Sequence, residues 1–306
     1  MRAWLEEALK NREVPFRKDV STATLSTFRI GGVCAFVIEP RCKGELIFAI
    51  GACRHASLSY AIIGRGSNVL FDDEALPPVL IRTVGLSGVR EENGRFVSDT
   101  GVSLTALARR AAQSGFADLA FAAGIPGTVG GGVYMNAGAH EKSLGELIEQ
   151  VTVYHPELDK IETYFHQKLS FSYRKSVFQT NNAVILDATL HCREPREPSA
   201  ILAEMQALCA TRAATQPLTQ PSAGSTFLRT ENGTSMGKII DELGLKGLRC
   251  GNAAVSEKHA GFIVNLGGAT ARDVRELIAV VQDIVEKNYG FRPRAEIRFV
   301  TENQKA

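Results

Sequence analysis

The chain has 306 residues with 35 basic and 33 acidic side chains, and 44% of its residues are hydrophobic. This composition excludes a disordered or collagen-like protein, and the formal charge of +2 gives no argument for a nucleic-acid or anionic-membrane partner, although it permits a local anion pocket. Because one core rarely extends beyond about 250 residues, we expect two or three domains that share a cleft.

Apolar residues at helical spacing predict a series of helices. The first, from Met1 to Lys10, is short and amphipathic and lacks the apolar core of a signal peptide. The longest apolar stretch, Leu46 to Cys53, is far shorter than the ~20 residues that a membrane-spanning helix needs. We therefore expect a cytoplasmic protein without a membrane partner. Further helices are predicted over 43–56, over 103–114, around 201–209, and from Thr270, with Asp273 in a capping-box-like pair, to the residue before Gly290.

Short runs of β-forming residues lie between the predicted helices. Their order is mixed, without regular alternation of strand and helix, which favours an α+β fold over a doubly wound parallel sheet. The charged, proline-interrupted stretch from Cys192 to Ser199 is typical of a domain linker. The predicted strands cover residues 57–63, 79–81, 150–154, 161–165, 184–190, 261–265 and 296–300.

The cysteines show no C-x-x-C pair and stand among apolar neighbours. This pattern favours reduced thiols of a cytosolic protein over a disulfide framework. We expect all of them to be buried as small hydrophobic side chains. They are Cys34, Cys42, Cys53, Cys192, Cys209 and Cys250.

A first glycine loop ends an apolar run, where residues 57–71 read SLSYAIIGRGSNVLF. Glycines allow a sharp turn whose successive N–H groups face an anion, and Ser67 and Asn68 can add side-chain hydrogen bonds. The loop is a candidate pyrophosphate site, but a tight hairpin turn explains it equally well. It is not a dinucleotide-binding fingerprint, because Val69 stands where the third glycine belongs, and residues 233–238 do not complete a P-loop.

A second and denser glycine segment begins at Ala123 and reads AGIPGTVGGGVYMNAGAH. Each ordered glycine costs more conformational entropy than another residue would, so this density indicates that something approaches the backbone closely. A glycine-rich helix packed against a neighbour is one explanation. A pyrophosphate ligand is the other, and the presence of two such loops favours it.

These two segments, preceded by TFRIGG at residues 27–32, resemble the FAD-binding region of the UDP-N-acetylenolpyruvoylglucosamine reductase (MurB) family. Further segments agree in the expected order, so that the resemblance extends from about Ser21 to Val300. They are FSYRKSVF at 171–178, PSAGSTF at 221–227, GLKG at 244–247 and VSEKHAGF at 255–262.

The resemblance implies an α+β fold with an FAD-binding domain of the PCMH/vanillyl-alcohol-oxidase type in two lobes, residues 1–62 and 63–192, and a C-terminal α+β substrate domain, residues 199–306. The short spacing between Arg174 and Ser225 resembles the shorter form of the family, which lacks an extra tyrosine-bearing loop. The implied activity is reduction of UDP-N-acetylglucosamine enolpyruvate to UDP-N-acetylmuramate in peptidoglycan precursor synthesis. Bound FAD would pass on the hydride of NADPH.

The resemblance also assigns roles to particular residues. Arg174 and Glu296 would stabilise the developing enolate at the carboxylate end of the substrate, and Ser225 would deliver a proton to it. Tyr173 would orient the substrate, and Lys246 and Lys258 would help to hold its diphosphate. The residues implied in FAD binding are Gly64, Arg65, Gly66, Ser67, Asn68, Gly127, Thr128, Gly131, Gly132, Asn136 and Gly138. No metal site is expected, and His259 is interpreted as a hydrogen-bonded structural histidine.

The chain departs from the family pattern in places where affinity and the cofactor environment, rather than the type of reaction, would be affected. The residues Leu228, Arg229 and Thr230 replace the usual Lys-x-Pro. His140 and Glu141 stand where Tyr-Gly is common, and Thr215 precedes Gln-Pro in place of a basic residue.

Two rival hypotheses stay open at this point. An FAD oxidoreductase with another substrate would keep the glycine loops without needing Arg174, Ser225 and Glu296 together. A non-enzymatic nucleotide-binding module would need neither flavin nor the C-terminal motifs. A small nucleotide sugar, with no nucleic acid and no membrane, is the expected partner.

Overall fold

The computed structural model describes residues 1–302, which form two compact units, each assembled from separate stretches of the chain. Helix, strand and irregular segments are mixed throughout both units, as the predicted α+β class requires. Unit 1 contains Met1–Phe16, Ile38–Arg65 and Ile81–Arg212, and unit 2 contains Arg17–Val37, Gly66–Leu80 and the chain from Ala213 onward.

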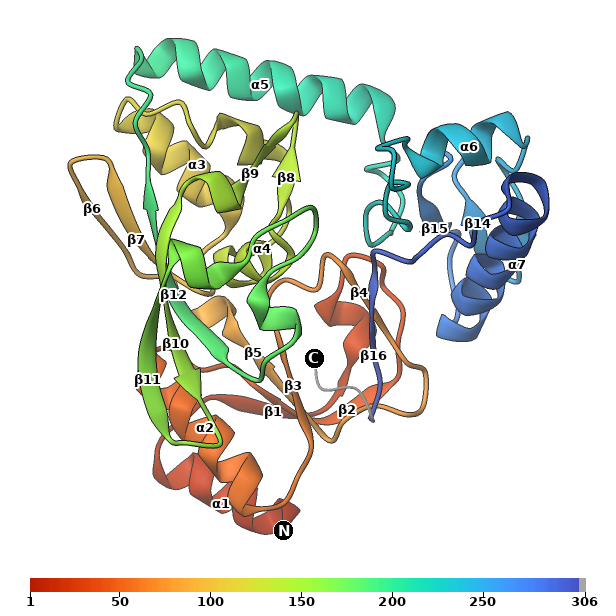
Figure 1. The fold of residues 1–306 in the computed structure, drawn as a ribbon. Helices are drawn as coiled ribbons and strands as arrows, with labels where there is room; N and C mark the ends of the chain where they lie inside the picture. The colour runs from red at the N-terminus through yellow and green to blue at the C-terminus, as the bar shows by residue number, and fades with distance from the viewer. Residues whose placement is uncertain (303–306) are drawn as a thin grey trace. The chain divides into compact units, whose positions relative to one another are not determined.

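Unit 1 is built around an antiparallel sheet with the strand order β11-β10-β12-β7-β6 (Figure 1). The inner strand β12 is buried along nearly its whole length, whereas the edge strand β11 is mostly exposed. The strands are β6 Val89–Glu92, β7 Arg95–Asp99, β10 Ile148–His155, β11 Lys160–Phe165 and β12 Val184–His191, and a small hairpin pairs β8 Gly138–Ala139 with β9 Lys142–Ser143.

Helices α3, α4 and α5 of unit 1 contribute apolar residues to the core of this sheet. One hydrophobic core joins buried residues of α3, α4 and the sheet, including Leu107, Val133 and Val153, and α5 adds Ile201 and Met205. The helices are α1 Arg2–Asn11, α2 Lys43–His55, α3 Leu104–Gln113, α4 Val129–Met135 and α5 Pro198–Thr215, whose last residues belong to unit 2.

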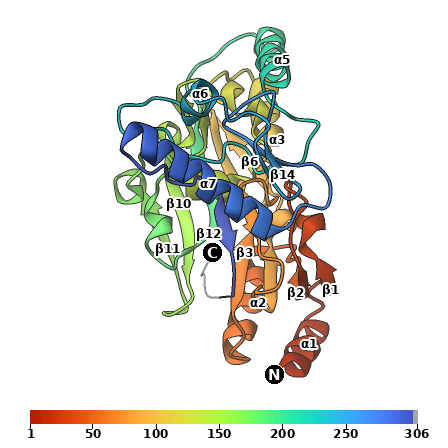
Figure 2. The same ribbon diagram turned by 90° about the vertical axis from the view of Figure 1, so that its right-hand side faces the viewer.

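Unit 2 has its own core beneath the long helix α7, Ala271–Tyr289 (Figure 2). The helix begins at Thr270, whose side chain accepts the Asp273 N–H in a capping box, and it ends at Gly290 with φ of 75°. Its apolar face packs against the sheet β13-β14-β15. The other elements are α6 Met236–Glu242, β13 Arg249–Cys250, β14 Ala253–Val255, β15 Ile263–Asn265, and β16 Arg298–Val300, which pairs in parallel with β4 Val69–Phe71.

The chain passes between the units within three strands, at the first glycine loop and within α5. The three strands are β1 Phe16–Ser21, β2 Val33–Ile38 and β5 Val79–Arg82, and β3 Tyr60–Ile63 precedes the loop. Short 3-10 segments lie at Thr22–Leu25, Thr83–Gly85, Ala120–Gly124, Leu144–Glu146, His166–Leu169 and Val177–Gln179.

Most predicted elements are confirmed, with two corrections. The hairpin interpretation of residues 64–68 is wrong, because β4 pairs with β16 and not with β3. The strand expected from Glu296 begins only at Arg298. The glycine-rich segment contains a helix, α4, which the explanation by packing had anticipated.

The predicted division into residues 1–62, 63–192 and 199–306 stays a prediction, and the compact units group the chain differently. The stretch after Cys192 belongs to unit 1, because Glu194 accepts the Ala117 N–H and Arg196 donates its N–H to Gly115. Within residues 1–302 the helices are all too short or too polar to cross a bilayer.

Candidate active site

The two glycine loops meet in unit 1 at Thr128. A Cβ on Gly64 would lie only 2.4 Å from the Thr128 Oγ1, so any side chain at position 64 would separate the loops. Thr128 is the N-cap of α4, and its Oγ1 accepts the N–H of Gly131 at 3.2 Å. The sequence predicted that both loops serve one ligand, and the contact between Gly64 and Thr128 is consistent with that prediction.

The second loop offers backbone donors to a ligand just before α4. Among residues 1–302, the N–H groups of Gly127 and Thr128 have no hydrogen-bond acceptor. The next N–H groups are already used, since Val129 donates to Val102, Gly130 to Thr100 and Gly132 to Thr128. At the beginning of α4, the two amides that precede the helix are therefore the ones open to an anion.

Packing explains two of the three glycines inside α4, Gly130 and Gly132. A Cβ on Gly130 would lie 1.9 Å from the Thr100 Oγ1, and one on Gly132 would lie 2.5 Å from a methyl group of Leu144. These contacts fit the explanation by helix packing that the sequence left open. A cofactor contact through Gly131 or Gly132 stays a prediction.

The first loop presents an uninterrupted row of donors. None of the N–H groups of residues 64–68 donates to a residue in the described part of the chain. Gly66 has φ of 66°, and a Cβ there would lie 2.2 Å from the carbonyl oxygen of Leu25, so only glycine fits. Successive unpaired amides in a glycine turn are the donor set that a diphosphate requires, and the loop thus fits an FAD diphosphate.

Arg174 lies at the tip of a tight turn in unit 1. Ser172 and Lys175 exchange backbone hydrogen bonds across the turn, and Arg174 adopts φ of 54°. Its guanidinium donates to the Gly138 carbonyl at 3.2 Å and lies 5.2 Å from the ring centre of Tyr173, which is 49% exposed. The structure thus brings together three residues that the sequence assigned to the site.

Asn136 is hydrogen-bonded to protein groups through both ends of its side-chain amide. Its side chain is buried, donates to the Ser172 carbonyl at 2.9 Å and accepts the Gly145 N–H at 2.8 Å. It ends α4 in a left-handed conformation with φ of 43°. The amide therefore links the helix to the Arg174 turn, and its predicted contact with FAD stays a prediction.

Ser225 and Glu296 are neighbours in unit 2. The Glu296 N–H donates to the carbonyl of Thr226 at 2.8 Å, and the Thr226 N–H donates to Gly261 at 2.8 Å. Ser225 is exposed and follows Gly224, which has φ of 80°.

Asn68 joins the same group. Its side-chain amide donates to the Glu296 carbonyl at 3.3 Å, and its own carbonyl accepts the Arg298 N–H at 2.9 Å. Unit 2 thus gathers the proposed proton donor Ser225, the proposed carboxylate Glu296 and the end of the first glycine loop.

The two lysines predicted to hold a diphosphate have protein partners. Lys246 forms an ion pair with Asp241 at 2.8 Å, and Lys258 donates to the Ala213 carbonyl at 2.6 Å. Arg65 and Ser67 lie in the first loop, exposed and half-buried respectively.

His259 is hydrogen-bonded as expected. Its Nδ1 accepts the Gly261 N–H at 3.1 Å, and burial lowers the pKa of the imidazole. Both features favour the neutral ring. No cluster of His, Cys, Asp and Glu within residues 1–302 has the arrangement of a metal site.

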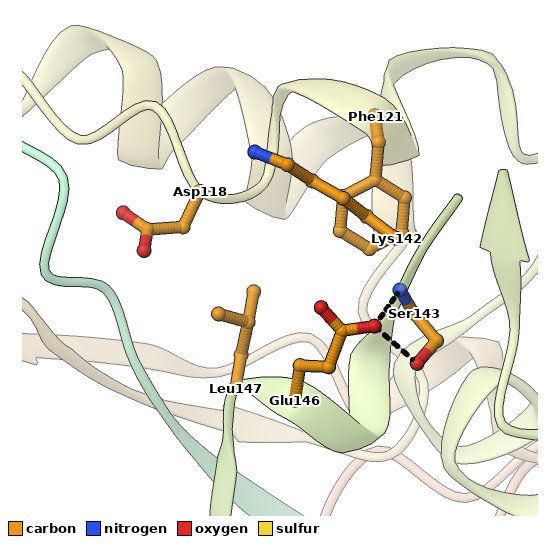
Figure 3. A pocket seen from close by; sticks show the side chains of 6 residues that line it. All are labelled: Asp118, Phe121, Lys142, Ser143, Glu146 and Leu147. Atoms are coloured by element: carbon orange, nitrogen blue, oxygen red, sulfur yellow. Dashed lines mark hydrogen bonds between the residues drawn. The ribbon is translucent and has the colours of Figure 1, made fainter. Parts of the chain in front are cut away.

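A separate cavity of about 130 Å³ lies in unit 1 (Figure 3). Two of the residues that line it are bonded to each other, since Ser143 donates both its N–H and its hydroxyl to Glu146, each at 2.8 Å. None of its lining residues belongs to the predicted site; they are Asp118, Phe121, Lys142, Ser143, Glu146 and Leu147.

Comparisons with known proteins agree with these features. Residues 34–157 match the family model described as an FAD binding domain, which defines the chain as a flavin-binding protein. Residues 216–300 match the C-terminal domain of UDP-N-acetylenolpyruvoylglucosamine reductase.

Whole-chain relatives carry the same name. The UDP-N-acetylenolpyruvoylglucosamine reductase of Caldicellulosiruptor bescii is 37% identical over 97% of this chain and 94% of its own length. The enzyme of Clostridium botulinum strain 657 is 38% identical over 90% of each chain. The crystal structure of the enzyme from Thermus caldophilus matches with a TM-score of 0.78 and 32% identity, over 94% of this chain and 98% of that chain.

The chain belongs to the UDP-N-acetylenolpyruvoylglucosamine reductase (MurB) family. It is therefore an FAD-dependent oxidoreductase, as predicted, and the hypothesis of a non-enzymatic nucleotide-binding module is wrong.

Proposed function

We propose that this enzyme reduces UDP-N-acetylglucosamine enolpyruvate to UDP-N-acetylmuramate, with NADPH as reductant, in peptidoglycan precursor synthesis. Family membership over nearly the whole chain supports this reaction. The observation that carries it is the backbone hydrogen bond from Glu296 to Thr226, which makes the proposed proton donor Ser225 a close neighbour of Glu296. A flavoprotein with a different reaction would have no need for this arrangement.

We infer that FAD is held by the backbone N–H groups of residues 64–68 and of Gly127 and Thr128. Their lack of acceptors within the described chain supports this assignment. The glycine at position 64 supports it as well, because a Cβ there would collide with Thr128. When bound, FAD supplies the two-electron redox chemistry that no side chain can provide.

The side chains would manage charge and protons during the reduction. Reduction of the enolpyruvyl group leaves an enolate-like centre beside its carboxylate, and the guanidinium of Arg174 would stabilise that negative charge through charge-assisted hydrogen bonds. The Ser225 hydroxyl would donate the proton. A serine is a weak acid, but an enolate held within hydrogen-bond reach is basic enough to take its proton, a contribution typically worth ~10²–10⁴-fold. Glu296 would share a hydrogen bond at the same end of the substrate.

We assign binding of the substrate to Tyr173, Lys246 and Lys258. The exposed ring of Tyr173 beside Arg174 supports its role as an orienting residue. Lys246 would have to share its charge between Asp241 and the substrate diphosphate. Leu228 and Thr230, which replace the usual Lys-x-Pro, are expected to alter affinity rather than the reaction. A cytoplasmic location and the absence of a nucleic-acid partner stay predictions.

Stopped-flow reoxidation of the NADPH-reduced enzyme tests the substrate assignment. We expect UDP-N-acetylglucosamine enolpyruvate to reoxidise the flavin at least 100-fold faster than dissolved dioxygen does, because Ser225 and Arg174 serve only the organic acceptor. Equal rates with the two acceptors would favour the other open hypothesis, an FAD oxidoreductase of the same fold that acts on a different substrate.

A further inference from the structure

The backbone of Arg174 is held in an unfavourable conformation. Its φ of 54° is left-handed, a region that residues with a side chain rarely adopt. Arg174 also occupies a central position of the tight turn between Ser172 and Lys175. Such strain persists only where surrounding contacts maintain it.

Gln179 makes two of the contacts that maintain this turn. Its side-chain amide donates to the Arg174 carbonyl at 2.9 Å and to the Tyr134 carbonyl at 3.0 Å. Tyr134 lies in the last turn of α4, where a carbonyl has no partner within the helix. One side chain thus fixes the strained peptide of Arg174 to the end of a packed helix.

Two further hydrogen bonds complete the attachment. Ser176 donates its hydroxyl to the Tyr134 carbonyl at 2.7 Å, and Asn136 donates to the Ser172 carbonyl at 2.9 Å. These two bonds hold the ends of the turn. Of the three side chains, only Gln179 holds the peptide of Arg174 itself.

We propose that Gln179 is a positioning residue that holds the Arg174 turn in its left-handed conformation and so aims the guanidinium. This inference rests on the proposed catalytic role of Arg174. Loss of the hydrogen bond from Gln179 lets the peptide of Arg174 relax toward an ordinary conformation. The guanidinium then leaves its place beside the Gly138 carbonyl and the Tyr173 ring.

Gln179→Met tests the proposal, because methionine has similar length but cannot donate a hydrogen bond. We expect reoxidation of the reduced flavin by UDP-N-acetylglucosamine enolpyruvate to slow by about 10–100-fold, while flavin reduction by NADPH changes less than twofold. Gln167→Met is the matched control, because the side chain of Gln167 is exposed and makes no hydrogen bond within residues 1–302. Gln179→Lys keeps a hydrogen-bond donor and should recover most of the reoxidation rate. This variant also tests the proposal if Gln179→Met folds poorly.

A double-mutant cycle separates positioning from a general effect on folding. In an Arg174→Ala background, Gln179→Met should cause no further loss of reoxidation rate. An equal loss in both backgrounds, or a normal rate in Gln179→Met alone, overturns the proposal. Normal turnover of Arg174→Ala by itself would instead overturn the catalytic role of Arg174, on which the proposal depends.

Discussion

Cys42 differs from the other cysteines in its exposure. The sequence predicted six buried thiols, but Cys42 is exposed at the N-cap of α2, and Cys209 and Cys250 are half-buried. The prediction was wrong at Cys42, which stands between the charged residues Arg41 and Lys43 and precedes the first turn of α2. At Cys53 and Cys192 it is confirmed, and burial raises the pKa of each thiol to about 12.

We therefore predict one rapidly reacting thiol in the native enzyme. A thiolate is the reactive species, so thiols that are buried and have a raised pKa react slowly. Titration with an aromatic disulfide reagent should show a fast phase of one equivalent that disappears in Cys42→Ser. A fast phase that survives in this variant would mean that another cysteine is exposed in solution.

His140 and Glu141, which stand where Tyr-Gly is common in the family, affect the conformation of the β8–β9 hairpin. These residues form the two-residue loop between β8 and β9, and they have φ of 52° and 63°. Two positive values in succession are the conformation of a type I′ turn, which favours Asn-Gly and disfavours residues such as His and Glu. The glycine that is common in the family at this place would therefore fit the turn better.

Glu141→Gly should stabilise the enzyme. Removal of the left-handed strain, about 1–2 kcal/mol, outweighs the larger conformational entropy of glycine, roughly 0.5–1 kcal/mol. A gain of about 1 kcal/mol corresponds to a rise of ~1–2 °C in Tm for a chain of this size. Glu231→Gly is the control, because Glu231 is exposed but is not among the residues with positive φ. An unchanged or lower Tm for Glu141→Gly would contradict the turn assignment.

Unit 2 has an ion pair that connects the end of β4 to α7. Arg275 lies 2.5 Å from Asp72, whose carboxylate also accepts the N–H groups of Glu74 and Ala75. Burial alone would raise the pKa of Asp72, but these hydrogen bonds and the guanidinium lower it overall. Because the pKa of Asp72 is lower in the folded than in the unfolded chain, its charge stabilises the folded state at every pH above the unfolded-state pKa of about 3.9. This contribution is lost as the pH falls from that value through the pKa of the folded state.

Asp72→Asn should consequently lower Tm at neutral pH and have little effect in acid. We expect the largest difference in Tm between wild type and variant at about pH 6–7. The difference should shrink below about pH 4, as Asp72 of the wild type becomes protonated first in the unfolded and then in the folded state. Thermal unfolding followed by circular dichroism across this range measures it. A difference that is constant with pH would show that the charge of Asp72 does not contribute.

At the level of elements, the sequence predicted best where one local signal determines the structure. The capping box at Thr270 and the glycine at position 290 located both ends of α7. The predicted start of the last strand, at Glu296, was wrong because the apolar pattern of a strand does not show how long its partner strand is. The strand β16 extends only over the residues that pair with β4.

For the whole molecule, the contacts that build the site connect distant parts of the chain. The motifs supplied the site residues, but only the fold shows that Gly64 lies against Thr128, or that Glu296 pairs with Thr226. Gln179 could not be found from any motif, because its role depends on the carbonyl groups of Arg174 and Tyr134 and not on its own residue type. Gly130 and Gly132 of α4 show the reverse case, in which packing explains residues that looked functional.

The central claim is that Ser225 supplies the proton to the reduced substrate. Its most direct test is Ser225→Ala in stopped-flow half-reactions, with Ser235→Ala as control, since Ser235 is an exposed serine of unit 2 whose side chain caps no helix amide. We predict that NADPH reduces the flavin of the variant at the wild-type rate, while reoxidation by UDP-N-acetylglucosamine enolpyruvate slows by at least ~10²-fold, as expected for loss of a general acid. Reoxidation of Ser225→Ala at a nearly normal rate would contradict the claim.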